Sequence, residues 1–309
     1  MTTPPLDVSV VICVRNGAGS IIRQLHALDS QVDAPPFEII IGDNGSTDAT
    51  VQVVRSWMDS GDHSARLIRL VDVGTKPGIP RARNRAASLA TGRIVAFCDA
   101  DDRVAPRWVR LIADNAPQGG LMGGRILAET HEGEPRPDVF PDGLPFNGFL
   151  PFIANCNFAI DRAPLKEMRG YDESLPAYGY EDVDLSWRAQ LSDRPLAYVP
   201  EATISMVLSS PSRALRKRFL LGQGRILMAH RYPHYDSRSY TLLTCSRDLA
   251  HDLWLTARVV SSKKTRHQAR RAGSLTVASA GRLWGVLRYG LLGYPPPHLA
   301  TTPSVSAQG

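Results

Sequence analysis

Three aspartates follow directly on a short apolar stretch and have the spacing of a divalent-cation site. Residues 94–98 are apolar, and Asp99, Asp101 and Asp102 come next. A short apolar run is typical of a buried parallel strand, and ligands of open α/β sheets bind at the carboxyl ends of such strands. Asp99 and Asp101 could hold a hard cation through oxygen and leave positions for phosphate oxygens. A solvated acidic turn is the alternative for this motif alone.

A second acidic pair, Glu181 and Asp182, opens a segment with helical spacing. Transfer of a group to a hydroxyl needs a carboxylate that takes the hydroxyl proton. Adjacent residues on a helix point about 100° apart, so we expect only one of the two to face an acceptor. The alternative is a structural role, because the helix dipole favours acidic residues in the first turn.

Polar residues also follow two other apolar stretches. Asp43, after residues 37–42, could accept a hydrogen bond from a base N–H or a ribose hydroxyl, although turn formation is an alternative role. Arg83 and Asn84 lie near the start of a helical segment, where basic residues could meet phosphate. We expect these two side chains to face inward.

These residues can act together only if a sheet brings the strand ends to one edge. Strand-like runs at 7–14, 37–42, 67–71 and 93–98 alternate with helical spacing at about 18–28, 49–57 and 81–90. This alternation predicts a parallel sheet with right-handed crossovers.

The later elements are less regular. We expect helices at 106–115 and 182–191, strands at 119–128, 153–160 and 196–199, and a long loop at 129–151. Past residue 211 the pattern is helical and basic, with helices at 242–260 and about 275–292 and a disordered tail at 294–309. Charges interrupt the second of these helices too often for a membrane span.

The charge is divided unevenly along the chain. The net charge of +6 combines −7 over residues 1–210 with +13 over residues 211–309, where 16 Lys and Arg face 3 Asp and Glu. A basic end suits an anionic membrane surface or nucleic acid, and a solvated basic helix bundle is the alternative. Four cysteines without paired spacing and the lack of a secretion signal favour a cytoplasmic location.

Four ordered segments, 8–16, 41–48, 82–86 and 97–102, resemble family 2 glycosyltransferases, and the resemblance extends over about residues 7–225. It implies an α/β, Rossmann-like GT-A fold with a mostly parallel central sheet flanked by helices, followed by a basic helical extension. It also implies Mg²⁺ or Mn²⁺ on Asp99 and Asp101. The nucleotide contacts implied in this way are Val14, Asn16, Asp43, Asn44, Arg83, Asn84, Asp99 and Ala100.

The resemblance continues on the acceptor side through segments 155–162, 170–173 and 179–188. In this family the second acid of the Glu-Asp motif usually serves as the base, which implies that role for Asp182 beside Glu181. Weaker acceptor or phosphate contacts are expected at Asn155, Asn157, Arg218 and Arg225. Residues 200–210 depart from the pattern, because they lack the His that many relatives carry there as a further metal or phosphate ligand.

The leading hypothesis is an inverting, metal-dependent glycosyltransferase that moves a sugar, with a UDP-sugar as the expected donor, to a saccharide or lipid-linked cell-envelope acceptor. We expect a catalytic domain at 1–210, with nucleotide binding at about 7–102 and an acceptor part at about 103–210, and a basic helical region at 211–293. The basic region predicts peripheral contact with the inner face of the plasma membrane. Two alternatives are a nucleotidyltransferase of similar fold and a non-enzymatic nucleic-acid-binding protein; the leading hypothesis expects no nucleic acid.

Overall fold

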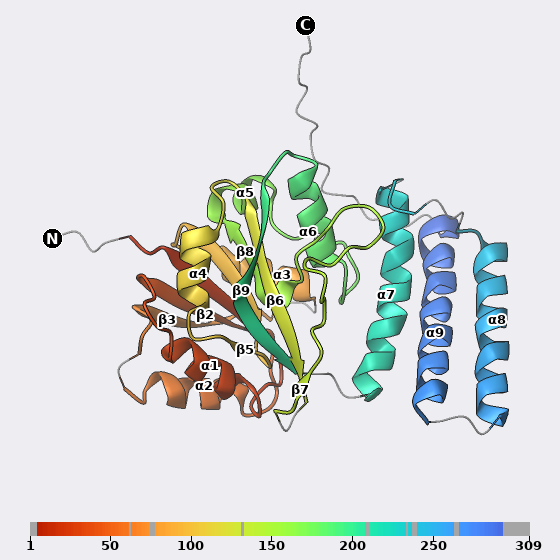
Figure 1. Ribbon diagram of the computed structural model, residues 1–309, viewed down its shortest axis with the longest axis horizontal. Coiled ribbons are helices and arrows are strands. Elements are labelled where there is room, and N and C mark those ends of the chain that lie inside the picture. The colour runs from red at the N-terminus through yellow and green to blue at the C-terminus, as the bar shows by residue number, and fades with distance from the viewer. Residues whose placement is uncertain are drawn as a thin grey trace, which may run out of the picture.

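The computed structural model describes residues 5–61, 63–74, 78–130, 133–207, 211–232, 234–236, 240–262 and 266–292. A central sheet is flanked by helices, and three long helices stand side by side at one end of the molecule (Figure 1). The strands are β1 (Val8–Val14), β2 (Phe37–Asp43), β3 (Leu67–Asp72), β4 (Ile94–Asp99), β5 (Arg103–Val104), β6 (Leu121–Glu129), β7 (Pro135–Arg136), β8 (Phe158–Asp161) and β9 (Leu196–Val207).

The helices of the sheet region are short. They are α1 (Ile21–Asp29), α2 (Thr50–Met58), α3 (Ile79–Ala87), α4 (Trp108–Asn115), α5 (Arg162–Glu167) and α6 (Glu181–Gln190), with a 3₁₀ turn η1 (Asn155–Asn157). The C-terminal helices are α7 (Pro211–Arg231), α8 (Leu242–Ser261) and α9 (Arg266–Gly285), and α9 continues into the wider turn η2 (Val286–Leu291).

In the described part of the chain the sheet order is β3-β2-β1-β4-β8-β6-β9-β5, with β7 paired to β6. The first four strands are parallel, as the alternation of strands and helices predicts. β8 runs antiparallel between β4 and β6, and β9 lies parallel to β6. The result is a mixed α/β sheet whose first half is wholly parallel.

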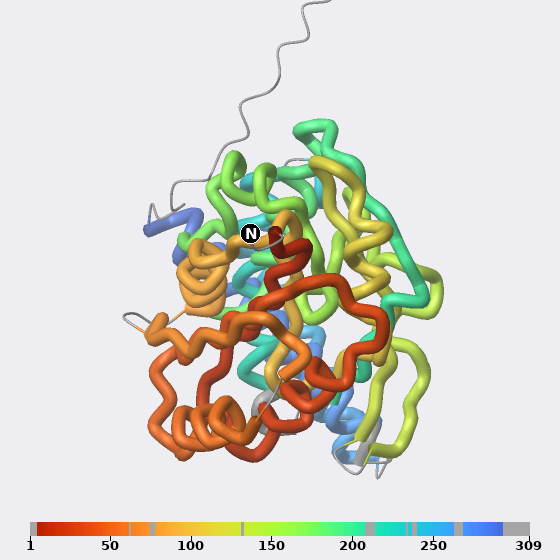
Figure 2. Tube along the Cα trace, turned by 90° about the vertical axis from the view of Figure 1, so that its left-hand side faces the viewer, coloured from red at the N-terminus to blue at the C-terminus, as the bar shows by residue number. Residues whose placement is uncertain are grey.

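Both faces of the sheet are covered by helices, so the parallel strands are apolar along nearly their whole length. Alternate residues of one strand point to opposite faces: Val10 and Ile12 pack with α1, α2 and α4, whereas Val11 packs with α3, α5 and α6. In Figure 2 the N-terminal strands and helices face the viewer and the C-terminal helices lie behind them.

The C-terminal helices pack on the sheet region through α6. Trp187 of α6 is fully buried, and its ring meets Tyr232 edge-on with centroids 5.1 Å apart. The Tyr232 hydroxyl donates to Asp184 of α6 at 2.8 Å, and Arg231 forms a buried ion pair with Asp172 at 3.2 Å. Polar and apolar contacts together therefore fix the end of α7 to the helix that carries the Glu-Asp motif.

Three predicted elements were wrong in extent. The strand expected at 153–160 is observed only at 158–161, because residues 155–157 form η1 and the N–H of Asn155 donates to the side chain of Asp182 at 3.2 Å. The strand expected at 196–199 runs on to Val207, because a register shift between Gly124 and Ile126 keeps it paired with β6. The last helix begins earlier, at Arg266. The expected tail at 294–309 lies outside the described residues.

Candidate active site

The ends of three neighbouring strands meet at one edge of the sheet. β1 lies between β2 and β4, and the register sets Val14 opposite Asp43 and Cys13 opposite Asp99. Parallel strands bring their carboxyl ends to the same edge, which is where ligands of open α/β sheets bind. The fold therefore assembles the polar ends of the first, second and fourth strands, which are far apart in sequence.

The loops after β1 and β2 are joined by reciprocal hydrogen bonds. The side-chain oxygen of Asn16 accepts from the N–H of Thr47 at 2.8 Å, and the Ser46 hydroxyl accepts from the N–H of Asn16 at 3.0 Å. Asn44 N–H donates to the Val14 carbonyl at 2.8 Å. Asn16 has a left-handed φ of 53°, a conformation that Asn tolerates better than most residues. The two loops thus form one pre-organised rim, which includes Asn16 and Asn44 among the predicted nucleotide contacts.

Asp43 is nearly buried, with 8% of its surface exposed. Its carboxylate accepts from the N–H of Ser46 at 3.2 Å, across a turn in which Gly45 has a φ of 74°. The turn role that was open as an alternative is therefore present in the structure. Contact of Asp43 with a nucleotide stays a prediction.

Of the three aspartates that follow β4, two have outward-facing carboxylates and one has a carboxylate that faces the interior. The side chain of Asp99 is 43% exposed and Asp101 is exposed, whereas Asp102 is buried. Asp102 accepts from the N–H of Val207 at 3.3 Å, and burial, together with the charges of Asp99 and Asp101, raises its pKa well above the ordinary value. Asp102 thus joins the motif to the end of β9, while the other two carboxylates reach the surface.

Arg83 connects this motif to the Glu-Asp motif. Its guanidinium donates to Asp99 at 3.0 Å and to Glu181 at 2.8 Å, and Arg83 is only 7% exposed. Burial alone would lower the pKa of Arg83, but the charges of Asp99 and Glu181 outweigh it and hold the group firmly protonated. The expectation that Arg83 faces inward is confirmed.

Asn84 also faces inward, but its amide binds protein backbone. The side-chain oxygen accepts from the N–H of Tyr171 at 2.8 Å, and the nitrogen donates to the Tyr171 carbonyl at 2.9 Å and to Glu173 at 3.1 Å. Gly170 approaches so closely that a Cβ atom there would lie 2.4 Å from the Asn84 oxygen. Asn84 therefore fixes the 170–173 segment to α3, and no described contact bears on its predicted role at the nucleotide.

Glu181 and Asp182 have different surroundings although they are adjacent. Glu181 is buried and paired with Arg83, whereas Asp182 accepts only from the backbone N–H groups of Val183 at 2.9 Å and Asn155 at 3.2 Å among the bonds described. Burial, followed by the charge of Glu181, raises the pKa of Asp182 to about 7, and Arg83 opposes part of that rise. A carboxylate with this pKa is suited to take a proton near neutral pH.

The side chain of Asn155 lies between Arg83 and Tyr171. With its amide oxygen turned toward Arg83, Asn155 accepts from Nη1 at 2.6 Å and donates to the Tyr171 hydroxyl at 2.5 Å. Tyr171 is buried, and the Arg83 guanidinium carbon is 5.9 Å from its ring centroid. Asn155, predicted as a weak acceptor contact, is thus part of the network that holds Arg83.

Two residues near the acidic pair were not singled out from the sequence. Burial, and then the charges of Glu181 and Asp99, raise the pKa of Tyr178. The ammonium of Lys217 lies 4.8 Å from the Tyr178 ring centroid. The adjacent Arg218, which was predicted instead, is exposed. The basic stretch of α7 predicted a cation in this region, and the phase of the helix brings Lys217 rather than Arg218 to Tyr178.

The other two residues predicted as weaker acceptor or phosphate contacts form hydrogen bonds within the protein. Asn157 accepts from the Trp108 indole at 2.8 Å and donates to the Ala202 carbonyl at 2.7 Å. Arg225 donates to Asp236 at 2.6 Å and to the Tyr240 hydroxyl at 2.7 Å. Neither residue is brought to the acidic pair by a described contact, and both roles stay predictions without support from the structure.

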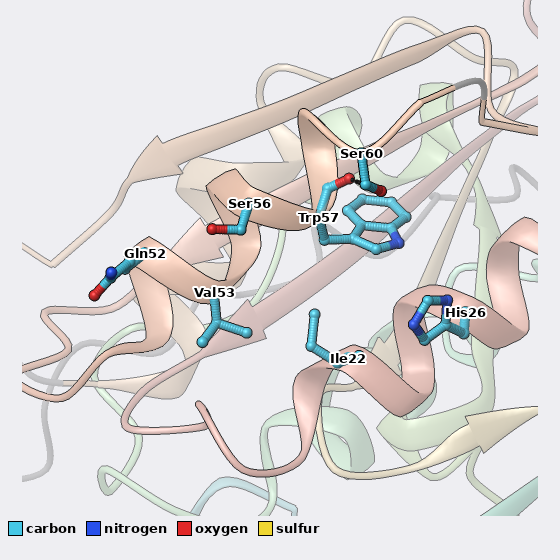
Figure 3. Close-up of a pocket in the computed structure, with 7 residues that line it drawn as sticks. All are labelled: Ile22, His26, Gln52, Val53, Ser56, Trp57 and Ser60. Carbon is cyan, nitrogen blue, oxygen red and sulfur yellow. Dashed lines mark hydrogen bonds between the residues drawn. The ribbon is translucent and has the colours of Figure 1, made fainter.

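A groove of about 550 Å³ lies elsewhere, between α1 and α2 (Figure 3). None of the candidate residues lines this groove. Its lining residues are Ile22, His26, Gln52, Val53, Ser56, Trp57 and Ser60.

The profile of Glycosyl transferase family 2 matches residues 9–168, just over half of the chain. The protein belongs to this family. Among its relatives, validoxylamine A glucosyltransferase of Streptomyces hygroscopicus subsp. limoneus is 26% identical over 232 residues, covering 63% of this chain and 50% of the relative. The amylovoran biosynthesis glycosyltransferase AmsB of Erwinia amylovora is 41% identical over 97 residues, 31% of each chain. This glycosyltransferase therefore matches half or less of these relatives' length.

Solved structures show that the fold of this glycosyltransferase is GT-A. The mannosyltransferase PcManGT from Pyrobaculum calidifontis, in complex with GDP-Man and Mn²⁺, superposes with a TM-score of 0.62 at 19% identity, over 91% of this chain and 88% of that one. S. aureus TarS 1-349, in complex with UDP-GlcNAc, gives 0.52 at 16% identity, over 92% of each chain. The predicted fold class is confirmed.

The donor set of this glycosyltransferase fits a divalent metal of the Mg²⁺ or Mn²⁺ type. Asp99 and Asp101 offer hard carboxylate oxygens at the surface, and Arg83 engages only one oxygen of Asp99 in the described bonds. No group of three His, Cys, Asp or Glu suited to a metal occurs among the described residues. Mg²⁺ typically takes one or two protein carboxylates, substrate phosphates and water, so two carboxylates suffice.

Proposed function

We propose that this family 2 glycosyltransferase moves a sugar from a nucleotide sugar to an acceptor hydroxyl with inversion at the anomeric carbon. The acceptor oxygen forms a bond to that carbon while the bond from the carbon to the diphosphate oxygen breaks. The diphosphate leaves with the bonding electron pair, and Asp182 takes the proton of the hydroxyl. A single displacement of this kind inverts the configuration.

The observation that carries the proposal is the environment of Asp182. Two backbone N–H groups orient its carboxylate, and burial together with the charge of Glu181 raises its pKa to about 7. A base with a pKa near the working pH combines a large deprotonated fraction with a sufficient affinity for the proton. Glu181, held by Arg83, acts here through its charge on Asp182 rather than on the acceptor.

The donor lies on the rim of strand ends. The joined loops carrying Asn16 and Asn44, with Asp43 behind them, hold the base and ribose. Asp99 and Asp101 face the diphosphate and would hold Mg²⁺ or Mn²⁺, which when bound would supply positive charge close to the diphosphate. Arg83 binds both Asp99 and Glu181, so it fixes the position of the donor half of the site relative to the acceptor half.

We infer the chemical class of the substrates from the similar structures and from the relatives. The PcManGT structure contains GDP-Man and Mn²⁺, and the TarS structure contains UDP-GlcNAc. We favour a UDP-sugar as donor, with GDP-sugars as the competing class. AmsB is named for amylovoran biosynthesis, which favours a saccharide or lipid-linked saccharide as the acceptor.

Thermal unfolding with a panel of nucleotide sugars, with and without Mn²⁺, tests the donor half of this proposal. A ligand that binds only the folded protein raises its apparent stability by mass action, by about 2.7 kcal/mol at a hundredfold excess over Kd. One nucleotide class should raise the Tm only when Mn²⁺ is present. A panel without any metal-dependent shift contradicts the proposal, and NMR of the product's anomeric proton tests inversion.

A further inference from the structure

The outer face of α8 has no described protein partner, whereas its inner face contacts α9. α9 lies between α7 and α8, so α8 forms the edge of the molecule (Figure 1). On the inner face, the Thr256 and Thr276 hydroxyls lie 2.8 Å apart. The opposite side of α8 is exposed along its length.

The two acidic residues of α8 both turn toward α9. Asp252 accepts a hydrogen bond from the Ser279 hydroxyl, and Asp248 lies 3.6 Å from the Arg282 guanidinium. Both carboxylates therefore have a partner on α9. The outward surface of α8 is left with basic and apolar side chains.

Four outward residues define what we call the α8 outer face: Leu243, Arg247, Trp254 and Arg258. Leu243 is 72% and Trp254 55% exposed, unusually high values for such large apolar side chains. The Arg258 guanidinium lies 5.3 Å from the Trp254 ring centroid. The spacings of four and seven residues place all four on one side of the helix.

Apolar side chains beside arginines, without acids, are the composition of a helix that lies in the plane of a membrane interface. Tryptophan is favoured at the headgroup level, where its ring is half in hydrocarbon and half in water. No helix in the described ranges is long and apolar enough to cross a bilayer. Contact with lipid along one side of α8 needs no such span.

We propose that the α8 outer face docks this glycosyltransferase on an anionic lipid bilayer. Charge complementarity selects this partner, because residues 211–309 contain 16 Lys and Arg against 3 Asp and Glu. This docking surface does not depend on the sugar-transfer reaction. It gives the sequence-based expectation of peripheral membrane contact a defined face and a defined orientation.

Co-sedimentation of the full chain with vesicles tests the proposal without any donor sugar. The chain should pellet with vesicles of phosphatidylcholine and phosphatidylglycerol at low salt and be released as NaCl rises, because ions screen surface charge. Pure phosphatidylcholine should retain much less. Each basic residue near an anionic surface contributes about fivefold to partitioning, so Arg247→Gln with Arg258→Gln should weaken it by roughly 25-fold.

Matched variants on the catalytic half control for general loss of charge. Arg55→Gln with Arg136→Gln removes two exposed arginines from α2 and β7 and should leave vesicle binding nearly unchanged. Leu243→Ser with Trp254→Ser should weaken binding at every salt concentration. Val32→Ser, at a position 48% exposed, is its control. Thermal unfolding of each variant establishes that it is folded.

Three results would overturn the proposal. The first is no binding to anionic vesicles at low salt. The second is binding that the control pair weakens as much as the α8 pair. The third is a chain that sediments as a dimer, becomes monomeric with Trp254→Ser and ignores vesicles, since α8 would then meet a second copy. An inactive transferase that still binds vesicles leaves the docking surface intact.

Discussion

Gly224 of α7 lies directly against the ring of Tyr180, the residue that precedes Glu181 and Asp182. A Cβ atom at position 224 would come within 2.6 Å of Cδ2 of Tyr180. Tyr180 also has a left-handed φ of 71°, which L-residues other than Asn and Asp rarely adopt. The C-terminal helices therefore pack against the first turn of α6, which carries the proposed base.

Gly224→Ala should consequently disturb catalysis from outside the site. The added methyl group forces the Tyr180 ring to move, and overpacking of this kind costs about 1–3 kcal/mol. We expect a lower free energy of unfolding in urea and a fall in turnover of about tenfold, because the start of α6 shifts with the ring.

Gly273→Ala in α9 is the matched control for this change. A Cβ atom there meets nothing within 4 Å, so the substitution should stabilise the protein by about 0.4–1 kcal/mol and leave turnover unchanged. A fully active Gly224→Ala protein with unchanged stability would mean that α7 does not position α6.

Asp182→Asn should lower turnover by roughly 10²–10⁴-fold, because the amide has nearly the same shape but cannot take a proton. Binding of the donor, measured by thermal shift, should barely change. The roles of the two acids would have to be exchanged if Asp182→Asn stayed active while Glu181→Gln lost turnover to this degree.

The activity should depend on pH through the same carboxylate. Asp182 must be deprotonated to act, and its pKa is about 7, raised chiefly by burial. We therefore expect kcat/KM to fall as the pH drops through about 7, well above the ordinary range of an aspartate. A rate profile that is flat from pH 8 down to pH 5 would exclude Asp182 as the base.

Asp101→Ala should abolish the metal-dependent part of donor binding. Asp101 is exposed at the end of the strand, so the variant should stay folded, which thermal unfolding of the free protein checks. The Tm shift that a nucleotide sugar causes with Mn²⁺ should fall to the shift seen with EDTA. Asp142→Ala removes an exposed carboxylate from another loop and should retain the full shift.

Arg83→Met should destabilise the protein by roughly 3–5 kcal/mol, because Glu181 would remain buried without a counter-charge. The double variant Arg83→Met with Glu181→Met should recover much of this loss, although not the activity. Arg107→Met breaks the exposed pair with Asp33 at 4.0 Å and should cost less than about 1 kcal/mol. Equal losses for the two single variants in urea unfolding would contradict a buried ion pair at Arg83.

Local pattern was sufficient for the first half of the fold. The apolar runs and their helical partners predicted β1 to β4 and α1 to α3 to within a few residues. Strands buried on both faces must be apolar throughout, and that requirement is visible in any short window of sequence. The structure also confirms two further predictions: α8 begins at Leu242, and Arg83 faces inward.

Pairing over long distances decided the rest. β9 is longer than the predicted strand because it stays paired with β6. Residues 155–157 are not extended because the N–H of Asn155 donates to the side chain of Asp182. No sequence window contains these partners.

The sequence by itself thus determined which carboxylates the protein offers and which edge of the sheet presents them. Only the tertiary structure decided their states: Glu181 is paired with Arg83, whereas burial and the charge of Glu181 raise the pKa of Asp182. The tertiary structure likewise decided that Asn84 forms hydrogen bonds with Tyr171 and that Arg225 forms hydrogen bonds with Asp236. The physical reason is that residue type fixes which bonds a side chain is able to make, whereas burial and the distance to other charges fix which of them it makes.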